Sequence, residues 1–254
     1  MKPIDAIKQN KKYFFLMIFL DFLFLLTVIN IMYVFFLPAT ESVLQMSDII
    51  QQEFVSMTDI VDFDARLAAN TEFMSLYYSL LQALLQFFVY CFVAWLLIKS
   101  LVWYLSHKSF HKKIPFFNYV FKFILLSTFW YVLVALALLL AVFVSRQAFV
   151  SLFHGGSIVF WIFFILILYF AQISFSLIPS TKTFINTFVF GVKKIKKIGV
   201  AFALNVVLTV TAFAVMIYCA KYSTTIGFLV LFFLALPTLV FCRFNMIVSA
   251  WKQN

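Results

Sequence analysis

The chain alternates between long apolar runs and short polar segments. An α-helix needs about 20 apolar residues to cross the roughly 30 Å hydrocarbon core of a bilayer, and six runs are long enough. We expect transmembrane helices over about 13–37, 73–98, 117–144, 157–178, 198–219 and 226–248. The pattern predicts an all-α polytopic membrane protein, with six transmembrane helices in three hairpins that form a single domain over residues 1–254.

Composition narrows the class of protein. The chain is 65% hydrophobic and only 11% charged, and its mean hydropathy is +1.08. Soluble domains carry about 25% charged residues, because much of their surface faces water. A soluble domain, a disordered chain and a fibrous repeat are therefore excluded, and an integral membrane protein is indicated.

Charge is distributed unevenly, and its pattern predicts the orientation of the helices. All nine acidic residues lie between Asp5 and Glu72. The loops and terminal segments on one side carry 14 Lys and Arg residues, whereas the opposite side carries only Arg66, Arg146 and Lys221. Because basic loops stay on the cytoplasmic side, we expect a cell-membrane protein with both termini cytoplasmic. The net charge of +10 then reflects orientation, and we expect no nucleic-acid partner.

The acidic outer segment is predicted to contain an amphipathic helix over about 41–67. Its apolar positions recur at steps of three and four residues, which places them on one helical face. This stripe consists of Val43, Met46, Ile50, Phe54, Met57 and Val61. It is typical of a docking surface for a partner or a second copy. The alternative is a helix that lies across the protein's own outer ends.

A second amphipathic helix is predicted on the cytoplasmic side, over about 182–198. Its apolar residues form one stripe, and four lysines, Lys193, Lys194, Lys196 and Lys197, occupy the other side. Such a helix lies in the plane of the membrane interface, where each basic residue gains about 1 kcal/mol near anionic lipid. We expect contact with anionic lipids on the cytoplasmic face. A simple positively charged anchor is the alternative to a lipid sensor or regulatory contact.

One acidic residue, Asp21, falls inside a predicted span. A charged group at that depth is costly and needs a partner. Arg243 and Lys122 lie at a similar distance from the cytoplasmic ends of their own spans, by the rise of 1.5 Å per residue. We expect Asp21 and Arg243 to pair, with Lys122 nearby. The pair either gates or couples ion movement, or it is a structural bridge between the first and last helices.

The second predicted helix carries a polar stripe near the middle of the membrane. Ser75, Ser79, Gln82 and Gln86 recur on one helical face. Polar side chains on other spans, Asn205 and Gln172 among them, are expected to meet this stripe. The stripe either lines a polar pathway or supplies hydrogen bonds between helices, which contribute about 0.6 kcal/mol each on average.

The sequence contains no motif that indicates catalysis, nucleotide binding or a metal site. The chain contains no HExxH motif, no nucleotide-binding glycine loop and no GxSxG motif, and no acid follows Glu72. His107 and His111 are four residues apart, but no acid or cysteine lies near them to complete a metal site. We therefore expect no enzymatic activity, no cofactor and no metal.

These patterns favour one function and leave one alternative open. We expect a non-enzymatic membrane scaffold or accessory subunit that associates with another membrane component or with copies of itself. The alternative is a small transporter or channel subunit with a polar pathway along the second helix. A water-accessible cavity lined by the Gln82 and Gln86 face would favour transport, whereas a dry bundle filled with Phe would favour association.

Overall fold

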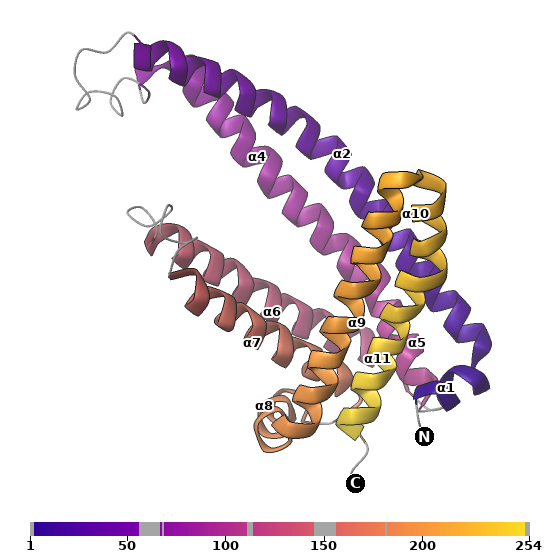
Figure 1. Cartoon of the computed structure of the whole chain (residues 1–254). Coiled ribbons are helices and arrows are strands. Elements are labelled where there is room, and N and C mark those ends of the chain that lie inside the picture. The colour runs from indigo at the N-terminus through magenta and orange to yellow at the C-terminus, as the bar shows by residue number, and fades with distance from the viewer. Residues whose placement is uncertain are drawn as a thin grey trace. The chain divides into compact units, whose positions relative to one another are not determined.

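The computed structural model is helical throughout the part of the chain that it describes. The described residues are 3–55, 67, 69–110, 114–144, 156–180 and 182–251. They form helices joined by short turns, without a strand among them (Figure 1). Their contacts define two compact units, unit 1 with Met1–Phe22 and Ile98–Asn254, and unit 2 with Leu23–Leu97. That the whole chain folds as a single six-helix domain stays a prediction.

Five helical stretches are long and apolar enough to cross a membrane. They are Lys11–Glu53, Thr71–Lys108, Phe116–Ala137, Ile195–Tyr222 and Thr224–Trp251. A shorter apolar stretch, Ile162–Ser176, forms most of α7 (Gly156–Ser176). These lengths and compositions indicate a membrane protein.

The first long helix, α2 (Lys11–Val55), runs without a break through Pro38. We expected a span ending near residue 37 and a separate amphipathic helix from about 41, and this division was wrong. Proline has no backbone N–H, so Pro38 removes one hydrogen bond of the helix. The residues after Pro38 still donate their backbone N–H groups within the helix. The Thr40 hydroxyl adds a bond of 2.9 Å to the carbonyl oxygen of Phe36. Residues 56–66 of the predicted 41–67 helix lie outside the described residues.

Unit 2 is a helical hairpin made by α2 from Leu23 onward and by α4 (Thr71–Ala94). Asn70 begins α4, and its side chain accepts a hydrogen bond of 3.0 Å from the backbone nitrogen of Phe73. Three aromatic pairs join the two helices, Phe24 with Trp95, Phe35 with Tyr90 and Phe36 with Phe87. Bulky rings therefore fill the space between these helices, as the scarcity of glycine in the sequence suggests.

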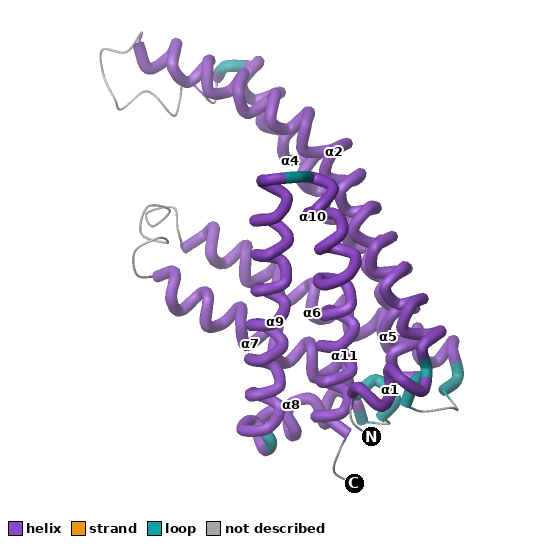
Figure 2. The backbone as a smooth tube through the Cα atoms, turned by 45° about the vertical axis from the view of Figure 1, so that its right-hand side comes forward, coloured by secondary structure: helices purple, strands orange, loops and turns teal. Residues whose placement is uncertain are grey.

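Unit 1 contains the start of α2 and the remaining helices. They are α1 (Pro3–Gln9), α5 (Ser100–Lys108), α6 (Phe116–Val144), α7, α8 (Thr183–Lys193), α9 (Ile195–Tyr222), α10 (Thr224–Val230) and α11 (Leu236–Trp251). Helix α6 packs on α7, and α9 packs on α10 and α11 (Figure 2). A buried core of Tyr169, Ile173, Ile198 and Met246 joins α7, α9 and α11.

The ends of several helices meet at one end of unit 1. The side chain of Asn10, next to α1, donates a hydrogen bond of 3.1 Å to the carbonyl oxygen of Ser109, next to α5. The indole of Trp251 at the end of α11 donates one of 2.7 Å to the carbonyl oxygen of Ser176 at the end of α7. Helix α1 also packs against α11. The segments around Asn10 and Ser109, which carry Lys8, Lys11 and Lys108, therefore meet at this end of the unit.

Two short π-helical segments lie inside longer helices. The segment η2 (Trp95–Lys99) connects α4 to α5, and η3 (Leu231–Ala235) connects α10 to α11. Pro237 explains η3, because its missing N–H and its ring disturb the preceding turn. The helix of the second expected span continues past residue 98, through η2 to Lys108, and the place where it leaves the membrane stays a prediction.

The predicted interfacial helix 182–198 is broken in two. Helix α8 ends at Lys193, Lys194 has φ −110° and ψ 24°, and α9 begins at Ile195. The buried edge of α8 holds the small residues Thr183, Thr187 and Gly191. The Tyr169 hydroxyl of α7 donates a hydrogen bond of 2.9 Å to the carbonyl oxygen of Gly191. Packing of α8 on α7 therefore turns the chain before α9 starts.

Candidate functional site

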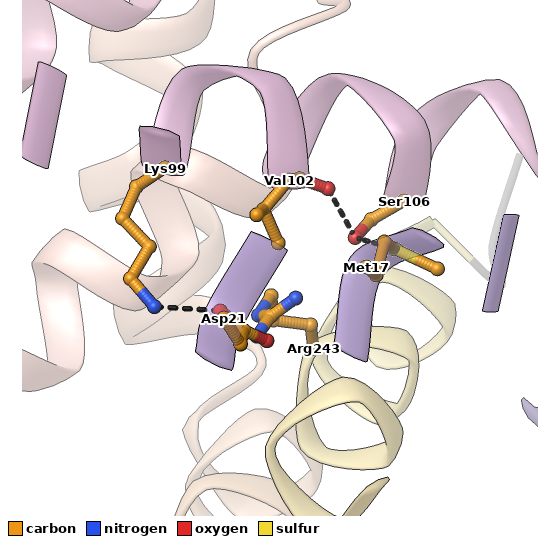
Figure 3. A network of polar contacts seen from close by, with 6 residues as sticks. All are labelled: Met17, Asp21, Lys99, Val102, Ser106 and Arg243. Carbon is orange, nitrogen blue, oxygen red and sulfur yellow. Dashed lines mark hydrogen bonds and ion pairs between the residues drawn. The ribbon is translucent and has the colours of Figure 1, made fainter. Parts of the chain in front are cut away.

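A buried cluster of one acid and two bases lies in unit 1 (Figure 3). Asp21 of α2 is 1% exposed. One of its carboxylate oxygens accepts a hydrogen bond of 2.6 Å from the ammonium group of Lys99. The other accepts a hydrogen bond from a guanidinium nitrogen of Arg243 on α11. A single carboxylate thus joins three helical segments that are far apart in the sequence.

Burial makes this cluster energetically important. Lys99 is 9% exposed and Arg243 is 8% exposed, so all three charges are largely removed from solvent. A buried charge without a partner is strongly unfavourable, and breaking such a pair costs about 3–5 kcal/mol. Because one acid serves two bases, the cluster carries a formal charge of +1. The second terminal nitrogen of Arg243 has no hydrogen-bond partner among the described residues.

The position of Lys99 depends on the π-helical turn η2, whose last residue it is. A π-turn rotates the side chains that follow it relative to an unbroken α-helix, and such turns often lie at functional sites. The charge pattern counts Lys99 among the 14 basic residues of the cytoplasmic side, because it directly follows the apolar run 73–98. The structure instead buries it against Asp21.

The third predicted member of the cluster, Lys122, lies elsewhere. Its ammonium group donates a hydrogen bond of 3.0 Å to the carbonyl oxygen of Ser180. Its depth along α6 matches that of Arg243, but depth does not determine which way a side chain faces around the helix. Lys99 occupies the place that we assigned to Lys122.

Further polar contacts hold α5 beside the cluster. The Ser106 hydroxyl lies 3.1 Å from the sulfur of Met17, one turn before Asp21 on α2. A ring nitrogen of His107 lies 2.9 Å from the carbonyl oxygen of Phe175 on α7. His107 is therefore part of the packing between α5 and α7, whereas His111 lies outside the described residues. Among the described residues, no group of three side chains could hold a metal ion.

The polar stripe of α4 lies on the surface of the hairpin that forms unit 2. Its members Ser75, Ser79, Gln82 and Gln86 are all exposed. Ser75 donates to the carbonyl oxygen of Glu72 within its own helix, at 2.8 Å. The side chains of Gln82 and Gln86 have no hydrogen bond among the described residues. The stripe therefore faces away from α2, the helix with which α4 forms its hairpin.

The expected partners of the stripe have other surroundings. The side chain of Asn205 on α9 donates a hydrogen bond of 2.9 Å to the carbonyl oxygen of Cys242 and accepts one of 2.9 Å from Asn245. Asn205 therefore ties α9 to α11. Gln172 is half-buried on α7. Whether these two residues of unit 1 meet the α4 stripe stays a prediction.

The lysines after α8 form an exposed basic surface. Lys193, Lys196 and Lys197 are exposed, and Lys194 lies over the ring of Phe190 at 4.4 Å. Apolar side chains of the same segment, such as Val192 and Ile195, are also exposed. Exposed apolar and basic residues side by side are typical of a helix at a membrane interface.

The ion cluster leads to a ranking of substitutions. Asp21→Asn leaves two buried cations without an acid, so we expect a loss of about 3–5 kcal/mol in the free energy of unfolding. Lys99→Met or Arg243→Leu leaves one pair intact and should cost less. The double change of Asp21→Asn with Arg243→Leu should recover part of the loss.

Thermal melts of these variants in one detergent measure the effect. Lys196→Met is the control, because it removes one positive charge, as Lys99→Met does, but from an exposed position. If the effects of Asp21→Asn and Arg243→Leu add to within about 0.3–0.5 kcal/mol, the two residues do not interact.

Comparison of the chain with protein-family models, curated protein sequences and solved structures gives no match. Function must therefore be argued from the charges, exposed surfaces and contacts of the chain itself.

Proposed function

We propose that the chain is a non-enzymatic membrane scaffold or accessory subunit, and that the exposed polar face of α4 binds another membrane component or a second copy. The observation that carries this proposal is the exposure of Gln82 and Gln86 on an apolar helix long enough to span a bilayer. Both glutamines lie near the middle of the expected span 73–98. Polar side chains at this depth normally face protein and not lipid.

The chemistry of the glutamine side chain supports a protein partner. Each amide has two N–H donors and one carbonyl acceptor, and lipid tails can satisfy none of them. An unsatisfied polar group in an apolar medium costs several kcal/mol. A second polar helix, or the same face of a second copy, supplies both donors and acceptors. Serines at 75 and 79 extend the face and permit a close approach of backbones.

The proposal includes a topology with six crossings of a cell membrane and both termini cytoplasmic. The positive-inside rule supports this orientation. The gathering of the ends of α1, α5, α7 and α11 at one end of unit 1 is consistent with it. Lipid contact through Lys193, Lys194, Lys196 and Lys197 belongs to the same proposal, because these residues would lie at the inner surface.

The outer part of α2 is proposed as a second contact surface. At 1.5 Å per residue, the 45 residues of α2 measure about 67 Å, roughly twice the thickness of the hydrocarbon core. The acidic residues Glu41 and Asp48 lie in the part that would extend beyond it. On the same stretch Val43 is 47% exposed and Ile50 is 37% exposed. An exposed apolar stripe beside acidic residues favours a basic or apolar partner outside the membrane.

Substitutions on the polar face of α4 distinguish a scaffold, which would lose its partner, from a transporter or channel, which would lose a flux. With Gln82→Leu and Gln86→Leu combined, we expect the chain to remain folded and inserted but to lose its partner. At about 0.6 kcal/mol per hydrogen bond, the loss of two or three bonds weakens association roughly eight- to twentyfold. Cross-linking in native membranes, followed by mass analysis of the purified complex, measures this loss.

Leu81→Ala and Leu85→Ala on an adjacent face of α4 are the matched control and should leave the complex intact. If the glutamine variant keeps its complex but abolishes a solute or ion flux, the transporter or channel alternative is correct and the scaffold proposal is wrong.

Topology is tested by labelling single cysteines in a variant that lacks Cys91, Cys219 and Cys242. We expect Asp48→Cys to react with a membrane-impermeant thiol reagent from outside the cell, because it lies beyond the hydrocarbon core. Lys194→Cys should react only after the membrane is opened. Labelling with the reverse sidedness would contradict the orientation.

A further inference from the structure

Helix α8 exposes an apolar face, although it is too short to cross a membrane. It has 11 residues, whereas a crossing needs about 20. At about 100° per residue, the positions on this face are neighbours around the helix. Their exposed fractions range from 36% to 64%, and the residues are Phe184, Ile185, Phe188, Val189 and Val192. Contact with lipid along a spanning helix therefore does not explain this face.

Contacts with α7 fix the level of α8 in unit 1. Helix α8 lies at the end of the unit where α11 ends (Figures 1 and 2). The ring centres of Phe188 and Phe170 are 5.2 Å apart. Gly191 is so close to the Phe170 ring that a Cβ atom at this position would lie 2.6 Å from it. Phe170 precedes Ser176, the end of α7, by six residues, so it lies about 9 Å inside that end.

This level matches the depth of an amphipathic helix at a membrane interface. Such helices bury their apolar face about 5–10 Å into the boundary between headgroups and acyl chains. In the proposed topology the end of α7 lies at the inner surface of the membrane. The apolar face of α8 is then at the level of the first acyl carbons of the cytoplasmic leaflet.

Four lysines form a basic border beside this face. Lys182 precedes α8 and Lys193 ends it, about three turns apart, so both lie on one side of the helix. Lys196 and Lys197 follow in the first turn of α9. All four are exposed, and the salt bridges of the described residues include none of them. No acid follows Glu72 in the sequence, so this positive charge has no acidic neighbour along the chain.

We propose that α8 lies in the cytoplasmic leaflet, with lipid acyl chains against its apolar face and the phosphates of anionic lipids on the basic border. Exposed lysines near an anionic membrane surface are attracted to it, and the apolar face supplies the hydrophobic part of the binding. This inference deepens the proposed lipid contact, because it assigns both parts of the lipid to one element. It rests on the proposed orientation and not on the partner of the α4 face.

Depth is measured with a fluorescent label on single cysteines, in the variant without native cysteines. Val192→Cys and, independently, Ile185→Cys carry the label, in vesicles of phosphatidylcholine and phosphatidylglycerol. A nitroxide near the top of the lipid acyl chain should quench both labels strongly, and one near the end of the chain should quench them less. A water-soluble nitroxide should quench them weakly, but should quench a label at Lys197→Cys strongly.

Lipid preference is measured at the Val192→Cys label, as the ratio of quenching by nitroxide-labelled phosphatidylglycerol to quenching by nitroxide-labelled phosphatidylcholine. The ratio should favour phosphatidylglycerol. Lys196→Gln should lower this preference about fivefold, the factor that corresponds to about 1 kcal/mol per lysine. Lys221→Gln is the matched control, because Lys221 is an exposed lysine at the other end of α9. It should leave the ratio unchanged.

Three results would overturn the proposal. Strong quenching by the water-soluble nitroxide would show that the apolar face meets water. Quenching by none of the probes would show that protein, a partner or a second copy, covers it. Equal quenching by the two lipids, or an unchanged ratio in Lys196→Gln, would exclude selection of anionic lipid. Reversed sidedness in the topology experiment would contradict the orientation instead, so the two failures are distinguishable.

Discussion

A carboxylate inside an apolar helix must find positive partners, and Asp21 finds two. Lys99 and Arg243 are 78 and 222 residues away in the sequence, yet both contact the same carboxylate. This requirement fixes the start of α2 against the beginning of α5 and against α11. The contacts of Ser106 with Met17 and of His107 with Phe175 follow from the same arrangement. The register of these helices in unit 1 thus depends on one acid.

The cost of leaving a polar group without a partner in the membrane applies equally to the polar face of α4. In unit 1 the buried charges of Asp21, Lys99 and Arg243 are paired. Asn205 is bonded on both its donor and its acceptor side. Gln82 and Gln86 are exposed, although they lie on an apolar helix. Their exposure on the hairpin of unit 2 is the observation behind the proposal that this face binds a protein partner.

The positions of most helices could be predicted from the sequence, because long apolar runs have few other solutions. The end of α2 and the length of the α4–α5 helix could not, since Pro38 and Lys99 resemble ordinary stop signals. The helix runs through Pro38 without a break, and Lys99 is buried by a π-turn that no periodicity reveals. Continued hydrophobicity after Lys99, with Leu101, Val102 and Trp103, was the available signal.

The depth of the site residues along their helices could be predicted from the sequence. The direction in which each side chain faces around its helix could not. Counting residues from the membrane ends placed Asp21 and Arg243 at one level, and the structure joins them. The same count placed Lys122 at that level, but its ammonium group bonds to the carbonyl oxygen of Ser180 instead. The angle around a helix depends on packing with neighbours, which one sequence does not contain. Local irregularities such as η2 change that angle further.

The central claim is that protein, and neither lipid nor water, covers the polar face of α4 in the membrane. Spin labels placed by Ser79→Cys, Gln82→Cys and Gln86→Cys, with Leu81→Cys and Leu85→Cys for comparison, test it through collision with oxygen and with a water-soluble nickel reagent. The account predicts that positions 79, 82 and 86 are protected from both reagents, while 81 and 85 collide freely with oxygen. High collision with nickel along 79, 82 and 86 would indicate a water-filled pathway, and high collision with oxygen would indicate bare lipid. Either result would contradict the account.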